Sequence, residues 1–137
     1  MRMRACLTEA DAVTMMAACR READKQGYAV SIAIVDDGGA LLRLERMDGV
    51  SATSATVATR KAGTAGTTGK PSRFWEERVG ERQVFLTFPG NLPIIGGVPI
   101  IHEGDCVGGI GVSGAPSEID EQIALAGVSA LVGPDAA

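Results

Sequence analysis

Two short glycine-containing turns constrain this chain most, because each separates two apolar runs of strand length. The first turn, Asp37-Gly38-Gly39, lies between the apolar runs of residues 28–35 and 40–46. The second, Glu103-Gly104-Asp105, joins Val98–His102 to Cys106–Val112. Connections of this length and composition are typical of β-hairpins. The sequence therefore predicts two hairpins and an antiparallel sheet.

Four further segments have the patterns of helices. Residues 8–27 carry apolar side chains three and four residues apart after a Thr8–Asp11 capping box, and they end at a glycine. Residues 51–69 are rich in Ala and Thr, and alanines at 55, 58, 62 and 65 predict a helix that packs closely on a sheet. A short helix follows Pro71, and the last covers residues 116–131, with Ser117 and Asp120 as its caps. We expect three of these helices to cover one face of the sheet in an α+β domain.

The composition fits one domain over residues 1–137 and excludes several functional classes. A chain of 137 residues that is 45% hydrophobic builds one core and has no room for a second. Its net charge of −4, its single Trp and its single Tyr argue against nucleic-acid binding. Residues 83–101 carry no charge, but their prolines and glycines exclude a membrane helix, so we expect a buried loop and strand there.

The N-terminal residues and the cysteines indicate the compartment. The first residues lack the apolar stretch of a secretory signal, so we expect a cytoplasmic protein with no membrane partner. Three cysteines and one histidine, without a CxxC pair, give neither a disulfide framework nor a metal site. We expect Cys6, Cys19 and Cys106 to be reduced thiols.

Glycine makes up 18 of the 137 residues, which is about 13% against a usual ~7%. Gly109 to Gly114 spell G-x-G-x-x-G, but too little chain follows for the second strand and acidic residue that dinucleotide binding needs. The same residues approach the nucleophile elbow of hydrolases, where Ser113 would have only His102 as its base. We therefore interpret these glycines as places where the backbone packs closely on the closing helix or on a ligand.

Two cations stand out as candidate anion ligands. Arg46 ends the first hairpin in the sequence Arg-Met-Asp-Gly, and Lys61 is followed by small residues in the Ala/Thr-rich segment. Arginine binds carboxylates as a bidentate fork, and lysine binds them as a point charge. The other cations of this region, at positions 60, 70 and 73, are more simply solvated charges of a helix face.

The order and spacing of several short motifs resemble the GlcG/HbpS-like family, which includes the C-terminal domain of PduO-type adenosyltransferases. The resemblance covers nearly the whole chain and rests on Ile34-Val35-Asp36 with Gly38-Gly39, Arg46-Met47-Asp48-Gly49, Lys61-Ala62, residues 96–100, residues 108–114, and residues 120–124 with 126–127. It implies a profilin-like α+β fold, with a five-stranded antiparallel sheet flanked by helices, assembled into a homo-oligomer. It also implies haem or tetrapyrrole binding in some members, and in others an accessory role in glycolate, diol or aromatic catabolism.

Three functional hypotheses follow for one pocket, framed by Arg46, Asp48, Lys61 and the backbones of Gly96, Gly97, Pro99, Ile100, Gly111, Ser113 and Gly114. In the first, a cytoplasmic oligomeric protein binds or degrades haem, or binds another anionic small molecule, with Arg46 and Lys61 on its carboxylates and Phe74, Trp75 and Phe85 as apolar walls. In the second, an isomerase or lyase anchors a small carboxylated metabolite on the same two cations, and Asp48 or Asp36 transfers the proton. In the third, the chain is a structural accessory subunit of a catabolic enzyme.

Overall fold

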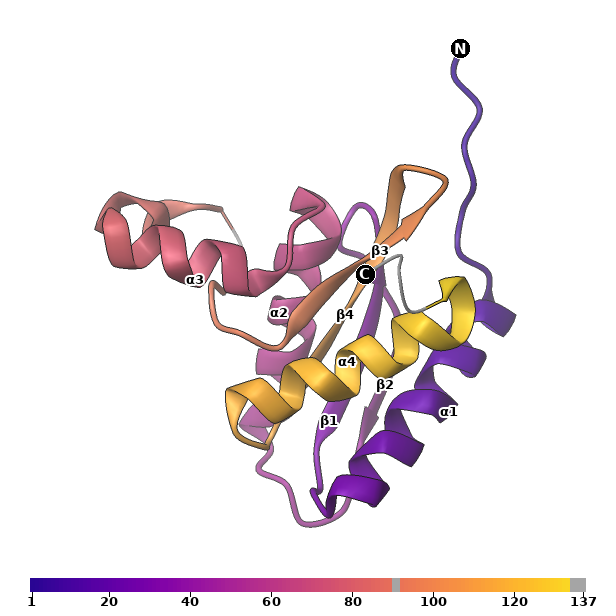
Figure 1. Ribbon diagram of the computed structural model, residues 1–137, viewed down its shortest axis with the longest axis vertical. Coiled ribbons are helices and arrows are strands. Elements are labelled where there is room, and N and C mark those ends of the chain that lie inside the picture. Colours follow the sequence, from indigo (N-terminus) through magenta and orange to yellow (C-terminus); the bar gives the residue numbers. More distant parts are fainter. Residues whose placement is uncertain (90–91, 134–137) are drawn as a thin grey trace.

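Two pairs of consecutive strands are separated and flanked by helices along the chain. The computed structural model describes residues 1–89 and 92–133. The elements are α1 (Glu9–Gln26), β1 (Ser31–Asp36), β2 (Leu41–Arg46), α2 (Thr53–Thr68), α3 (Ser72–Glu81), the 3₁₀ helix η1 (Gln83–Thr87), β3 (Gly97–His102), β4 (Asp105–Ser113) and α4 (Ser117–Val132). The described strands form one antiparallel sheet in the order β2-β1-β4-β3 (Figure 1).

Both predicted hairpins are present and the α+β class is confirmed, but the expectation of five strands is wrong. The described residues form four strands, two from each hairpin. The inner strands β1 and β4 join the hairpins, with Ser31 opposite Ser113. The described chain between the hairpins forms α2, α3 and η1, so it supplies no further strand.

The helices cover both faces of the sheet, whereas we expected three of them on one face. Helices α1 and α4 pack on each other and cover one face, and α2 packs on the other against β4, β1 and β3 (Figure 1). The side chains of β1 alternate accordingly: Ile32 and Ile34 point to the α1–α4 layer, and Ala33 and Val35 point to α2. All four are fully buried, so this central strand needs cover on both sides.

Helix α1 begins and ends as predicted. The Thr8 hydroxyl accepts a hydrogen bond from the Asp11 N–H, and the Asp11 carboxylate accepts one from the Thr8 N–H. Gly27 ends the helix in the left-handed conformation, with a φ of 80°. The inward face carries Met15 and Met16, which belong to the larger core between the sheet and the α1–α4 layer.

The backbones of α2 and β4 pack in almost direct contact, with glycines of β4 between them. A Cβ placed on Gly111 would lie 2.0 Å from the Ala58 carbonyl oxygen, and one on Gly109 would lie 2.5 Å from the Ala62 carbonyl oxygen. No real Cβ approaches a backbone atom so closely, so only glycine fits at these positions. These glycines let α2 pack closely on the sheet, and close packing of this helix is what the alanine spacing predicts. The element that meets them is α2 and not the closing helix α4.

Helix α3 and η1 form an arm, residues 72–88, that is attached to the sheet and to α4 through its first turn and projects away from them in Figure 1. Trp75 packs on Phe74 and Phe88 within the arm, with ring centroids 5.0 and 4.6 Å apart. The arm's Arg73 guanidinium forms ion pairs with Glu118 and Glu121 of α4, which raise the pKa of Arg73.

The uncharged stretch 83–101 is buried only in its second part. Val84 and Leu86 are 54% and 60% exposed, whereas residues 97–100 form a buried strand. Residues 90 and 91 lie outside the described part of the chain. None of the described helices is long and apolar enough to cross a membrane.

Candidate functional site

The residues predicted to bind an anion lie around the end of the sheet where β2 and β4 finish. Arg46 and Ser113 both lie opposite Ser31 in the strand pairing, so they share this end. Arg46 is exposed, and so is Asp48 in the connection that follows it. These side chains therefore lie at the surface and do not enclose a site.

Lys61 is buried, and its ammonium group is already bound within the chain. Its Nζ donates hydrogen bonds to the Val112 carbonyl oxygen at 3.0 Å and to Asp120 Oδ2 at 3.2 Å. The side chains of Lys61 and Asp120 are each only 3% exposed. The other carboxylate oxygen of Asp120 accepts a hydrogen bond from the Ala115 N–H at 3.0 Å. The ion pair thus ties α2 and the end of β4 to α4.

Burial and pairing act on Asp120 in opposite directions. Burial raises the pKa of Asp120 above its ordinary value, and the Lys61 charge lowers it, with burial the larger of the two effects. The sequence indicates that Ser117 and Asp120 cap α4, and this is wrong. Pro116 takes the cap position, and α4 has no side-chain cap. A ligand carboxylate at Lys61 would have to replace both Asp120 and the Val112 carbonyl.

The glycine backbones predicted to frame a ligand are in contact with the chain itself. A Cβ on Gly96 would lie 2.7 Å from Lys61 Nζ, and one on Gly97 would lie 2.3 Å from the Lys61 carbonyl oxygen. Gly114 has a φ of 130°, and a Cβ there would lie 2.6 Å from Val50 Cγ2. Pro99 and Ile100 are buried within β3. The binding role assigned to these residues stays a prediction.

The acids proposed for proton transfer are not in a closed cleft. One carboxylate oxygen of Asp36 accepts hydrogen bonds from the N–H groups of Gly38 and Ala40, both at 2.9 Å, so Asp36 holds the first turn in shape. Asp48 is exposed. The isomerase or lyase hypothesis therefore gains no support from the geometry.

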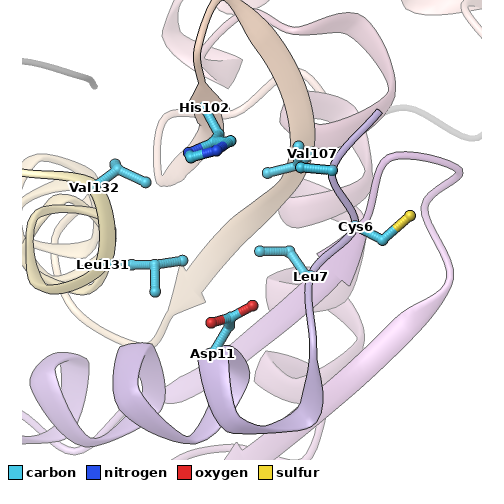
Figure 2. Close-up of a pocket in the computed structure, with 8 residues that line it drawn as sticks. Cys6, Leu7, Asp11, His102, Val107, Leu131 and Val132 are labelled. Atoms are coloured by element: carbon cyan, nitrogen blue, oxygen red, sulfur yellow. The ribbon is translucent and has the colours of Figure 1, made fainter. Parts of the chain in front are cut away.

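A different group of residues surrounds a cavity of about 220 Å³ between the N-terminal segment and the ends of β3 and α4 (Figure 2). The cavity is lined by Ala5, Cys6, Leu7, Asp11, His102, Val107, Leu131 and Val132. Figure 2 shows His102 and Asp11 at opposite ends of this space, with Leu7 and Leu131 pointing into it between them. We call it the His102 cavity.

The His102 cavity combines apolar walls with one imidazole. The His102 side chain is 47% exposed, and its Nε2 lies 3.9 Å from the Glu103 carboxylate. An accessible imidazole nitrogen can bind a metal or a hydrogen-bonding ligand. Cys6 adds an exposed thiol, whereas burial raises the pKa of the Cys19 thiol to about 12 and makes Cys19 unreactive.

The sequence did not predict this cavity, because its walls come from both ends of the chain. The signals that it did carry are the position of the single histidine at the end of a strand and a leucine just before the first helix. The aromatic side chains predicted as ligand walls, Phe74, Trp75 and Phe85, pack on one another in the arm instead. A second cavity, of about 300 Å³, is lined by Gly38, Gly39, Thr59, Arg60, Gly63, Thr67 and Pro89.

Comparison with known proteins supports the resemblance found in the sequence. The sequence model of the family described as haem degrading protein, HbpS-like, matches residues 7–129. The chain belongs to this HbpS-like family. Protein GlcG of Escherichia coli (strain K12) is 37% identical to it over 114 residues, which are 82% of this chain and 85% of GlcG.

Solved structures of similar proteins confirm the fold of this HbpS-like chain. The crystal structure of a double mutant of HbpS from Streptomyces reticuli matches with a TM-score of 0.90 at 37% identity, and the match covers 96% of this chain and 90% of that one. The crystal structure of a PduOC:haem complex matches with a TM-score of 0.84 at 24% identity, over 92% of this chain and 95% of that one.

Two segments that carry the resemblance to the HbpS-like family meet in the structure. One contains Lys61 and the other contains Asp120, and the buried ion pair joins them. This pairing gives both segments a structural role, because it links α2 on one face of the sheet to α4 on the other. The Lys61 ammonium is therefore occupied within the chain, whereas the His102 cavity offers an accessible imidazole.

Proposed function

We propose that this protein binds haem or a related tetrapyrrole at the His102 cavity. The observation that carries the proposal is the accessible imidazole at one end of an apolar cavity. Histidine is a common axial ligand of haem iron, and apolar walls suit the face of a flat macrocycle. Membership in a family described as haem degrading supports the same ligand, and PduOC, whose structure contains haem, shares the fold.

The residues of the cavity divide between metal binding and apolar contact. His102 would hold the iron, and Leu7, Val107, Leu131 and Val132 would cover part of the macrocycle and exclude water from it. Bound haem would supply the redox chemistry of its iron. Arg46 and Lys61 do not line this cavity, so the proposal assigns them no contact with the ligand.

Titration of the purified protein with haemin tests this proposal. We expect a saturable shift of the Soret band, and we expect His102→Ala to weaken binding by at least about tenfold because the iron loses its ligand. Arg46→Ala is the matched control, because Arg46 is exposed and lies outside the cavity. The absence of a saturable shift would refute haem binding, and a His102→Ala variant that binds like the wild type would refute the site.

We also propose that the chain assembles into a homo-oligomer through the arm. The arm exposes Val84 and Leu86 by more than half of their surface, and apolar side chains of this kind are typical of contact surfaces when they gather on one element.

Sedimentation equilibrium is expected to show a mass above 14.1 kDa for the wild type and a shift toward the monomer for Leu86→Asp. Val13→Asp, at an exposed position on α1, should leave the mass unchanged. A wild-type monomer, or an unaltered Leu86→Asp oligomer, contradicts this proposal.

A further inference from the structure

We infer that the His102 cavity accepts the carboxylate-free edge of a tetrapyrrole, and that Asp11 excludes carboxylate groups from it. This inference rests on the proposed function and names which side of the ligand enters. It follows from three properties of the cavity: its size, the apolar character of its walls, and the sign of its charge.

The size of the cavity limits how much of the ligand it can hold. Its volume is about 220 Å³, whereas pockets that bury a whole drug-sized ligand usually measure about 300–1,000 Å³. A macrocycle with its substituents is larger than a drug-sized ligand, so one edge enters and the remainder lies outside. The question is therefore which edge the cavity favours.

The walls favour an alkyl or vinyl edge. Val107 is 5% exposed, and Leu7, Leu131 and Val132 are partly buried side chains that pack on the main core. Figure 2 shows Leu7 and Leu131 on opposite sides of the space, pointing into it, so a group between them has carbon on both sides. Burial of methyl and vinyl groups between such walls is favourable, and burial of a carboxylate there is not.

The charge of the cavity opposes a carboxylate. The eight lining residues include no lysine or arginine, and they include the carboxylate of Asp11. One Asp11 oxygen accepts a hydrogen bond from the Thr8 N–H at 2.8 Å, which fixes the side chain in place toward the cavity. Two carboxylates in one partly enclosed space repel each other. Arg4, next to the lining segment, is itself ion-paired with Asp37.

The turn beside His102 adds further negative charge that repels a ligand carboxylate. Glu103 and Asp105 are exposed on either side of Gly104, where β3 turns into β4, and both carry negative charge. A ligand carboxylate at the His102 end of the cavity would therefore meet the acids of the turn, and one at the opposite end would meet Asp11. The favoured orientation places the propionate groups outside, in water.

Fluorescence titration with two metal-free porphyrins tests the inference without any contribution from iron. Protoporphyrin IX carries its two carboxylates on neighbouring rings and leaves one edge free of them, whereas coproporphyrin I carries a carboxylate on every ring. We expect coproporphyrin I to bind at least about tenfold more weakly than protoporphyrin IX. Asp11→Asn should narrow this ratio, because the amide removes the repulsion and keeps an oxygen for the Thr8 N–H.

Thr8→Ala is the matched control for Asp11→Asn. It removes the other half of the same helix cap and leaves the Asp11 charge in the cavity, so the ratio between the two porphyrins should stay at its wild-type value. Circular dichroism would verify that both variants fold. Equal affinity for the two porphyrins, or a ratio that Asp11→Asn does not narrow, would overturn the inference while haemin binding at His102 still stands. Failure of haemin and both porphyrins to bind would refute the proposed function as well.

Discussion

The Lys61→Met variant is expected to lose about 3–5 kcal/mol of its free energy of unfolding near pH 8, because Asp120 remains buried with an unpaired charge. Both side chains are 3% exposed, so water cannot replace the lost partner. Chemical denaturation in guanidinium chloride, followed by circular dichroism, measures the loss. Arg20→Ala is the exposed control. It removes an ion pair with Glu45 whose arginine is 42% exposed, and such a pair contributes about 0–1 kcal/mol.

The loss in Lys61→Met should depend on pH in a defined direction. Burial already raises the pKa of Asp120, and removal of Lys61 takes away the charge that lowers it. The pKa of Asp120 in the folded variant therefore lies above its value in the unfolded chain. The contribution of Asp120 to stability is then fully present below the unfolded value and is lost as the pH rises through the folded value. The variant is thus expected to be least impaired in acid, at or below about pH 4.

A double variant isolates this effect from the loss of packing. In Lys61→Met with Asp120→Asn, the buried charge is gone and the amide oxygen still accepts from the Ala115 N–H. We expect this variant to recover most of the stability near neutral pH and to lose the additional pH dependence. Additive losses from the two substitutions, with the same pH dependence as the wild type, would show that the pair does not couple α2 to α4.

The Gly111→Ala variant is expected to lose about 3 kcal/mol of its free energy of unfolding, the upper part of the usual range for overpacking a core. The new Cβ would lie 2.0 Å from the Ala58 carbonyl oxygen and 2.5 Å from the Ala62 N atom. Neither backbone atom can rotate away, so α2 must move off the sheet. Thermal and chemical denaturation of the purified variant measure the effect.

Gly63→Ala is the matched control for Gly111→Ala. Gly63 lies within α2, and a Cβ there would meet no atom within 4 Å. Alanine is a better helix former than glycine by about 0.5–1 kcal/mol, so this variant should equal or exceed the wild type in stability. Wild-type stability in Gly111→Ala would mean that α2 is not held at the sheet by close backbone contact.

The candidate site was less predictable than the fold, and particular residues show why. The sequence shows Lys61 in a small-residue helix, but its partner Asp120 lies 59 residues away, where the local pattern indicates a helix cap. His102 was visible as the single histidine, but nothing local to it indicates that Leu7 and Leu131 lie on either side of one cavity. A glycine in a strand indicates that another part of the chain or a ligand packs closely there, but it does not indicate which one.

The sequence by itself determined the elements whose geometry depends on neighbours in the chain. The turn at Gly38-Gly39, the capping box of Thr8 and Asp11, and the left-handed Gly27 all act within a few residues, so local chemistry fixes them. Only the tertiary structure decided which helix meets the glycines of β4, which carboxylate neutralises Lys61, and which side chains enclose the space beside His102. Those contacts join residues far apart in sequence, and their geometry depends on how both faces of the sheet are covered at once.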